Sequence, residues 1–293
     1  MYSLSQIWKG LRNPHYIVSE WNRLLNIARN RKRYNPDGID IFSEDWDNLL
    51  ILDACRYDEF ARINTIPGEL EARISRGSNS REFVRGNFSD SRLHDVVYVS
   101  ANRYYAHMHD RIGAEVHEYI PTELDAPDVS SSLPETVTEA AIEAAERYPN
   151  KRLLVHYLQP HQPYFGPEND HLENRKDIHG TIEANDLSDT ELREAYRKNL
   201  RYVLTHVEQL LEHLEGKTVI SADHGELLGE RERPIPMKSY GHPSGVYVDE
   251  LVKVPWHVHE GGSRKRLVAE EPSETMAISE NVDQTLRDLG YRV

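Results

Sequence analysis

Short apolar runs, each bounded by polar or turn-forming residues, recur along this chain and predict buried β-strands. Runs of this length are typical of strands that are covered on both faces, as in a parallel sheet. They fall at residues 46–52, 96–100, 152–158, 218–221 and 252–258. Over residues 188–214, apolar positions recur every three or four residues, which predicts a long helix that Gly216 ends. A strand, a helix and a strand in direct succession predict a βαβ crossover, and therefore an α/β fold with a mostly parallel sheet.

Both ends of the chain read as helical. Residues 1–34 place apolar side chains at helical spacing among lysines and arginines, which predicts an amphipathic helix. Such a helix either packs on the main domain or anchors the protein to an anionic surface such as acidic lipid head groups. We expect residues 1–40 to form an N-terminal helical extension and residues 41–293 a catalytic α/β domain, with a closing helix over 273–293.

The composition of the chain limits the classes of partner that it can bind. The chain carries 49 acidic and 35 basic residues, a net charge of −14, which in general disfavours nucleic acid and anionic membranes. Any anion site must therefore be built locally from a metal, arginine or histidine. Cys55 is the single cysteine, which excludes an intrachain disulfide. No apolar run approaches the ~18 residues of a membrane span and no signal peptide is evident, so we expect a cytoplasmic protein, in contact with a membrane at most peripherally.

Acidic side chains follow two of the predicted strands. Asp53 comes directly after the strand at 46–52, and Asp223 and His224 follow the strand at 218–221. Ligands of open α/β sheets bind at the carboxyl ends of the strands. A carboxylate beside an imidazole suits a divalent metal such as Zn or Mn. The alternative is that Asp223 caps a helix and His224 is an ordinary turn residue.

A serine-rich turn is the candidate for a nucleophile. Residues 75–83 read SRGSNSREF, a polar turn that opens a helix, and a helix N-terminus attracts anions. Ser78 or Ser80 could act as a nucleophile there, although an N-cap serine is the simpler interpretation. His161 lies in a proline-punctuated loop after the third strand, and His242 lies in a glycine-flanked loop that could fold back over the strand ends.

Four segments together resemble the alkaline phosphatase and sulfatase superfamily. They are LLILDACRYDEF, HYLQPHQPY, ISADHGELLGE, and a late GH followed by VKVPWHV. Their order and spacing agree over roughly residues 45–260. The resemblance implies a mostly parallel sheet with helices on both faces, and a metal-dependent hydrolase or transferase.

The resemblance also implies roles for individual residues. Asp53, Asp223 and His224 would hold a divalent metal (Zn, Mn or Ca). Ser78 would be the nucleophile and a further ligand, because its turn resembles that of the lipoteichoic acid synthase branch, with Ser80 as the second candidate. The expected contacts to the transferred group or the leaving oxygen are His161, His242, His156, Arg56 and Arg81.

One departure bears on the substrate. True sulfatases convert a cysteine in a Cys-x-Pro-x-Arg turn to formylglycine, whereas here the turn carries serines. We therefore expect phosphate-type esters, on a small molecule, a glycan or a lipid-linked substrate, rather than sulfate esters. A sulfatase and a non-catalytic descendant that binds partners are the alternatives. Because no Asp accompanies His156 and His161, we expect one firm metal site and a doubtful second.

Overall fold

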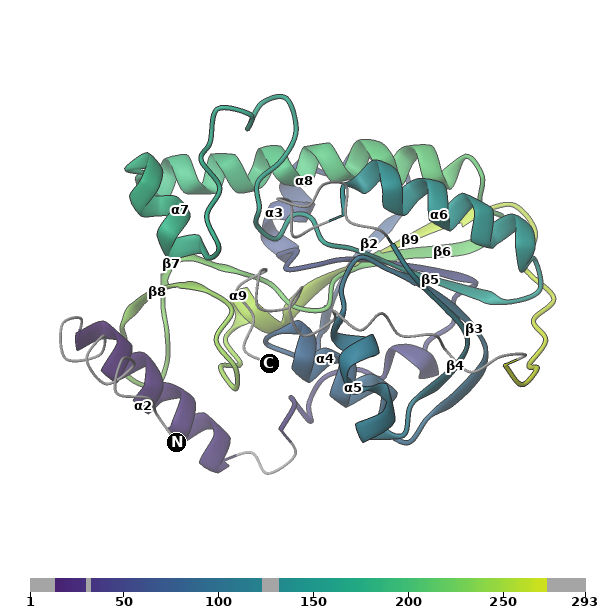
Figure 1. Ribbon diagram of the computed structural model, residues 1–293, viewed down its shortest axis with the longest axis horizontal. Coiled ribbons are helices and arrows are strands. Elements are labelled where there is room, and N and C mark those ends of the chain that lie inside the picture. Colours follow the sequence, from purple (N-terminus) through teal and green to yellow (C-terminus); the bar gives the residue numbers. More distant parts are fainter. Residues whose placement is uncertain (1–13, 30–32, 123–131, 273–293) are drawn as a thin grey trace.

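The computed structural model describes residues 14–29, 33–122 and 132–272 (Figure 1). Its centre is a seven-stranded sheet in the order β2-β9-β6-β1-β5-β3-β4. The strands of this sheet are β1 (Asn48–Leu52), β2 (Glu69–Ile74), β3 (Arg92–Ser100), β4 (Glu115–Pro121), β5 (Arg152–Tyr157), β6 (Gly216–Ser221) and β9 (Lys253–Gly261). A separate two-stranded ribbon joins β7 (Leu227–Arg231) to β8 (Lys238–Gly241).

The sheet is parallel except at one edge. β6, β1, β5, β3 and β4 pair in parallel, while β9 runs antiparallel to both β6 and β2. Every residue of β1 is buried, as its unbroken apolar run predicts for a strand covered on both faces. The predicted α/β class with a mostly parallel sheet is therefore confirmed.

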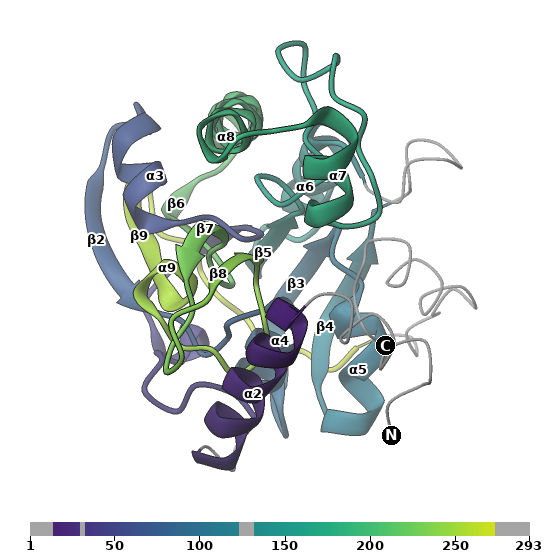
Figure 2. The same ribbon diagram turned by 90° about the vertical axis from the view of Figure 1, so that its left-hand side faces the viewer.

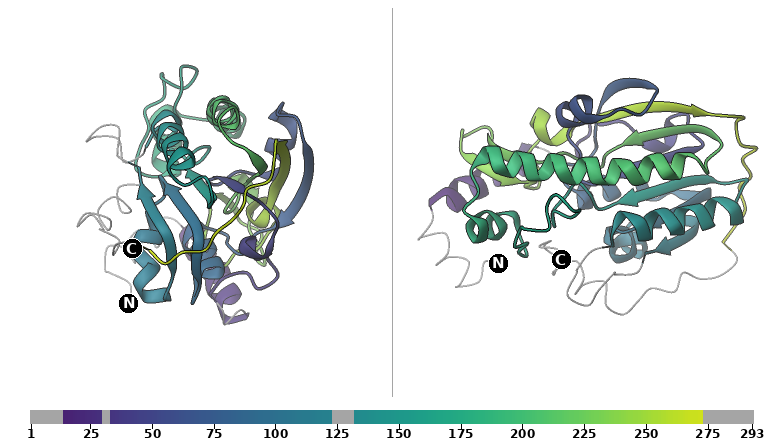
Figure 3. Two further views of the ribbon diagram at one scale, coloured as in Figure 1. Left: turned by 90° about the vertical axis from the view of Figure 1, so that its right-hand side faces the viewer. Right: turned by 90° about the horizontal axis from the view of Figure 1, so that it is seen from above.

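Helices cover the two faces of the sheet. α6 (Pro134–Arg147) and α8 (Asp189–Leu211) lie side by side over one face, and α4 (Ser80–Phe88) and α5 (Tyr104–Ile112) lie over the other (Figures 1 and 2). Seen from above in Figure 3, α8 extends along nearly the whole length of the molecule. The remaining helices are α2 (Pro14–Arg29), a 3₁₀ turn (Ile41–Ser43), α3 (Tyr57–Ile63), α7 (Ile178–Asn185) and α9 (Asp249–Val252).

The crossover helix follows from its sequence. Ser188 and Glu191 form a reciprocal capping box at the start of α8, and its apolar residues at three- and four-residue spacing are buried against the core. α7, in contrast, lies in a mostly polar segment of the sequence. Asp177 caps this short helix through the amide of Gly180 (2.8 Å), and its few apolar residues gave too weak a period to predict it.

The two terminal predictions have different outcomes. The N-terminal helix is present as α2, which ends at Arg29, whereas residues 1–13 and 30–32 lie outside the described residues, as does the predicted closing helix over 273–293. The domain boundary at residue 40 stays a prediction. In the described parts of the chain, no helix is both long and apolar enough to cross a bilayer.

Candidate metal and nucleophile site

The centre of the site lies where β1 and β6 end. These strands are parallel neighbours, with Ile51 opposite Ser221, so both chains leave the sheet at the same edge. Ala54 turns the backbone with a positive φ of 62°, and its amide donates a hydrogen bond to Asp223 Oδ1 (3.1 Å). Asp53 and Asp223, 170 positions apart in the sequence, are thereby brought together as the strand-end pattern predicts.

Three side chains converge here at separations that suit a single ion, and His156 lies just beyond them. The ligand atoms of Asp53, Asp223 and His224 all lie within 4.8 Å of one another. His224 Nε2 is 3.4 Å from Asp53 Oδ1 and 3.3 Å from Asp223 Oδ2. His156 Nε2 is 3.8 Å from Asp53 Oδ2 and 3.7 Å from Asp223 Oδ2. Ligands at zinc-like bond lengths in a tetrahedron stand roughly 3.3–3.6 Å apart, so these residues fit one divalent cation.

Unpaired polar atoms in the cluster also favour a bound cation. Asp223 Oδ2 and His156 Nε2 are buried, and neither has a hydrogen-bond partner among the described residues. Leaving such groups unpaired costs about 1–3 kcal/mol each, which a coordinated cation would offset. Burial opposes protonation of His224, but the charges of Asp223 and Asp53 raise the pKa of His224 to about 10. The cluster therefore attracts positive charge strongly enough to hold a proton that a cation would replace.

Neighbouring side chains orient these groups. Asn102 Nδ2 donates to Asp53 Oδ2 (2.8 Å), and Tyr98 Oη lies 2.9 Å from His156 Nδ1. His224 Nδ1 lies 2.8 Å from the carbonyl of Gly225, which leaves Nε2 toward the carboxylates. Hydrogen bonds of this kind fix the tautomer and direction of metal-binding histidines.

Of the two candidate serines, Ser80 lies beside this cluster. Its Oγ is 3.3 Å from Asp53 Oδ2 and 3.3 Å from His224 Nε2. The Ser78 hydroxyl instead lies 3.1 Å from Glu82 Oε2 and 2.9 Å from the carbonyl of Pro243. The first choice of Ser78 as nucleophile and ligand does not fit these contacts. The reason is local: Asn79 is the N-cap of α4, so Ser80 opens the helix at the strand ends while Ser78 remains in the preceding turn.

A second set of ligand atoms adjoins the first. His161, Glu226 and His242 place theirs within 4.8 Å of one another, with His242 Nδ1 3.0 Å from Glu226 Oε1. The ring centres of His242 and His224 are 4.6 Å apart, so the loop that carries His242 does fold back over the strand ends. Burial raises the pKa of Glu226, but the charges of His242 and His161 lower it more. Glu226 was not predicted as a ligand, although it is part of the DHGE segment. With Glu226, the second metal site that was expected to be doubtful has a set of three ligand residues.

The two candidate arginines have different surroundings. Arg56 is buried in ion pairs with Asp58 (2.8 Å) and Glu230 (2.5 Å), and it donates to the carbonyl of Glu226 (3.1 Å). It therefore supports the backbone of Glu226 and does not fit the expected role as an anion contact. Arg81 follows Ser80 on α4, and its Nε is buried with no hydrogen-bond partner in the described structure. Cys55 is fully buried, and burial raises the pKa of its thiol, as expected for a packed, unreactive thiol.

No family model matches the sequence, and no curated protein matches it. Solved structures do. The C-terminal periplasmic domain of phosphoethanolamine transferase EptC from Campylobacter jejuni matches with a TM-score of 0.48 and 16% identity, over 72% of this chain and 78% of that one. The corresponding EptC domain from Escherichia coli, in complex with Zn, matches with a TM-score of 0.47 and 12% identity, over 76% of this chain and 77% of that one. The lipoteichoic acid synthase LtaP from Listeria monocytogenes matches with a TM-score of 0.44 and 12% identity, over 84% of this chain and 72% of that one.

The chain is similar to proteins of the sulfatase-like superfamily. This agrees with the resemblance of the four sequence segments. Two of the similar structures are periplasmic domains by name, which contradicts the expectation of a cytoplasmic protein, and that expectation is withdrawn. At this level of identity the likeness concerns the fold, so the chemistry follows from the geometry of the site.

Proposed function

We propose that this protein is a metal-dependent hydrolase or transferase that acts on phosphate-type esters through Ser80. One observation carries the proposal. The Ser80 hydroxyl lies 3.3 Å from both Asp53 and His224, inside a buried set of ligand atoms at single-ion separations. A nucleophile and a metal-binding set at that distance are what covalent transfer of a phosphoryl-type group requires.

The metal would be held by Asp53, Asp223, His224 and His156. Two imidazole nitrogens among the donors favour Zn or Mn over Ca, which takes oxygen ligands almost exclusively. When bound, the cation supplies a lowered pKa at the serine hydroxyl and neutralises charge on the transferred group.

The chain's own residues account for the rest of the transfer. Ser80 Oγ forms a bond to phosphorus while the ester bond to the leaving oxygen breaks. The hydroxyl proton is released to a water molecule, because the 3.3 Å neighbours of the hydroxyl, Asp53 and His224, are both assigned to the metal. His242 lies beside the site, with its ring centre 4.6 Å from that of His224, and the ring centre of His161 is 5.0 Å from that of His242. A proton from either histidine completes the leaving alcohol. Water or an acceptor alcohol then takes the group from Ser80, giving hydrolysis or transfer respectively.

Arg81 is the proposed anion contact. It directly follows the nucleophile on α4, and its guanidinium carries a buried Nε–H with no partner among the described residues. A planar guanidinium donates two parallel hydrogen bonds to a phosphate group. Glycan and lipid-linked esters are the substrate classes that we propose.

Metal content and ester turnover test this proposal together. Purified wild type is expected to retain Zn or Mn in a one-to-one ratio at the first set, and Asp223→Asn to lose it. With nitrophenyl phosphate, a bis-nitrophenyl phosphodiester and nitrophenyl sulfate as substrates, we expect turnover of a phosphorus ester in preference to the sulfate. Ser80→Ala should abolish turnover and Ser78→Ala should retain most of it. Equal metal content in wild type and Asp223→Asn, or full activity in Ser80→Ala, would refute the assignment.

A further inference from the structure

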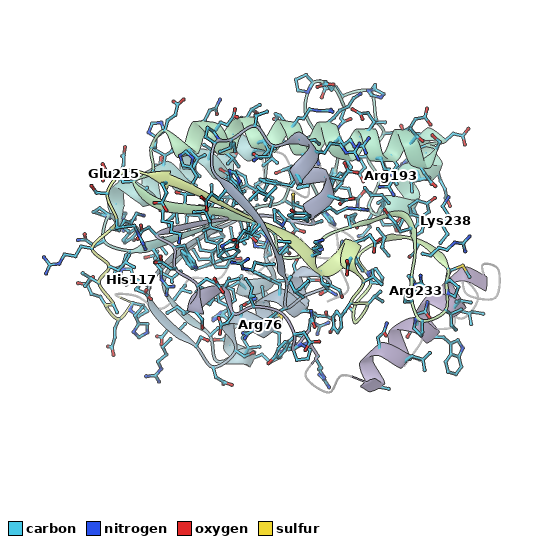
Figure 4. The ribbon with its side chains drawn as sticks, turned by 180° about the vertical axis from the view of Figure 1, so that it is seen from behind. Arg76, His117, Arg193, Glu215, Arg233 and Lys238 are labelled. Carbon is cyan, nitrogen blue, oxygen red and sulfur yellow. The ribbon has the colours of Figure 1, made fainter. Side chains whose placement is uncertain are left out.

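The N-terminal helix α2 docks on the protein through its polar side. Asn22, which is fully buried, donates from Nδ2 to Glu232 Oε2 (3.1 Å) and to the carbonyl of Ile235 (2.8 Å). Its Oδ1 accepts from the amide of Ile235 (2.9 Å). These partners lie in the turn that joins β7 to β8. Figure 4 shows α2 beside Arg233 of that turn, at the end of the molecule away from Glu215.

The apolar side of α2 faces outward. Ile17, Trp21, Leu24 and Leu25 are 41%, 57%, 43% and 40% exposed, and their spacing places them on one helical face. Asn22 lies off this face, about 100° of helical rotation from Trp21, and Asn26 continues its row. An amphipathic helix normally turns this face to the core, so α2 is packed in reverse.

The sequence around this helix is basic. Residues 1–34 hold seven Lys and Arg and one acidic residue, in a chain whose net charge is −14. Arg33, just beyond α2, belongs to a cluster with Arg81, Arg85 and Arg111, whose like charges, after burial, lower the pKa of Arg85. Among the described residues, none of these four arginines forms a salt bridge. Among the described residues Glu82 opposes the effect of the other arginines on Arg85, and an external anion would neutralise the remaining positive charge.

The helix and the arginines occupy the same side of the molecule. α2, α4 and α5 lie along one side, opposite α6 and α8, in both Figures 1 and 2. Arg81 and Arg85 are on α4 and Arg111 is on α5. Exposed apolar residues on a helix, with basic side chains around them, are the features that bind an anionic lipid surface.

We infer that α2 and the arginine cluster form a docking surface for an anionic lipid bilayer, with Trp21 and Leu25 inserted among the head groups. A second copy of the chain is the competing occupant of the apolar face. Two copies would bring like-charged basic clusters together, and a strip one helix wide offers little area for a stable dimer. A bilayer satisfies both the apolar and the basic half of the surface.

Vesicle flotation with the full chain tests this inference. Wild type should float with vesicles of phosphatidylcholine and phosphatidylglycerol and remain behind with phosphatidylcholine alone, and added salt should release part of it. Trp21→Glu combined with Leu25→Glu should lower the bound fraction about tenfold, as should Arg33→Glu combined with Arg111→Glu. Leu267→Glu, at a 38% exposed leucine of another surface, and Arg92→Glu, at an exposed arginine of β3, are the matched controls and should bind as wild type does.

Three results would overturn the inference. They are absence of wild-type flotation, equal loss in the Leu267→Glu control, and concentration-dependent dimers, measured by light scattering, that Trp21→Glu dissociates without any vesicle binding. Thermal melting of each variant separates loss of binding from loss of folding. None of these readouts uses ester turnover, so the docking surface and the catalytic proposal fail independently.

Discussion

Asn102 donates its side-chain amide to Asp53 Oδ2 over 2.8 Å, inside the buried core of the site. Asn102 follows the end of β3 just as Asp53 follows the end of β1, so a third strand tip fixes the orientation of a proposed metal ligand. The consequence is testable. Asn102→Ala removes the donor and should weaken metal affinity roughly 10- to 100-fold, as loss of such supporting contacts usually does.

Competition with a chromophoric chelator measures that affinity. Asn185→Ala, which removes a surface side chain bonded to the Glu173 loop, is the control and should leave the affinity unchanged. An Asn102→Ala protein with wild-type affinity would show that Asp53 is held by other contacts or is not a ligand.

Removal of the metal should lower thermal stability. A cation that binds only the folded chain stabilises it by about 2.7 kcal/mol at one hundred times its dissociation constant. For a chain of this size, that corresponds to a melting temperature lowered by roughly 5 °C or more when a chelator is added. The measurement is differential scanning fluorimetry with and without chelator. Asp223→Asn should melt at the same temperature in both conditions, whereas Asp170→Asn, at an exposed loop aspartate, should respond as wild type does.

Lys265, which lies outside the proposed site, predicts that the stability of the folded protein depends on pH. Its Nζ donates to Asn48 Oδ1 (2.6 Å), and burial lowers the pKa of Lys265 from 10.5 to about 8, against a smaller opposing effect of Asp47. Between these pH values the unfolded chain binds more protons than the folded chain, so folded stability rises with pH across this window. The free energy of unfolding of wild type, minus that of Lys265→Met, should increase by up to about 3 kcal/mol from pH 7 to above pH 10.

Urea unfolding at a series of pH values gives that difference directly. Subtracting the variant removes the titration of all other groups that the two proteins share. A difference that stays flat, or falls as the pH rises, would contradict the lowered pKa of this half-buried ammonium group.

Gly225, next to His224, packs closely against the backbone of α9. A Cβ built on Gly225 would lie 2.1 Å from the carbonyl oxygen of Glu250 in α9, a contact that cannot be relieved by a side-chain rotation. Gly225→Ala should therefore cost on the order of 1–3 kcal/mol of stability and displace the neighbouring His224, with loss of ester turnover. Chemical denaturation and the nitrophenyl phosphate assay check both effects. Gly180→Ala, where the nearest atom is Arg175 Cβ at 3.0 Å, should change either one little.

The fold and the aspartate pair followed from the sequence because they depend on local patterns. Buried parallel strands have unbroken apolar runs, and their ends meet at one edge whatever lies between them, so Asp53, Asp223 and His224 could be grouped in advance. The choice between Ser78 and Ser80 as the nucleophile could not be predicted, because it depends on which residue starts α4. A shift of two residues there moves a hydroxyl from the strand ends into the turn.

Other features depended on partners distant in the sequence. Arg56 appeared available for an anion, but Glu230, 174 positions later, pairs with it. Asn102 is an uncharged residue two positions after the end of β3, and such a residue has no distinct signal of metal-site chemistry in the sequence. The reversed packing of α2 rests on Asn22 and Asn26, which reach the turn after β7, and helical periodicity does not report such contacts.

The ribbon of β7 and β8 has a base and a tip with different attachments. Its base is flanked by Glu226, directly before β7, and His242, directly after β8, while its tip holds α2 through Asn22. α2 is therefore connected, through two paired strands, to Glu226 and His242 at the base of the ribbon. The surface on which α2 rests and the second set of ligand atoms thus share one element of the fold, the β7–β8 ribbon.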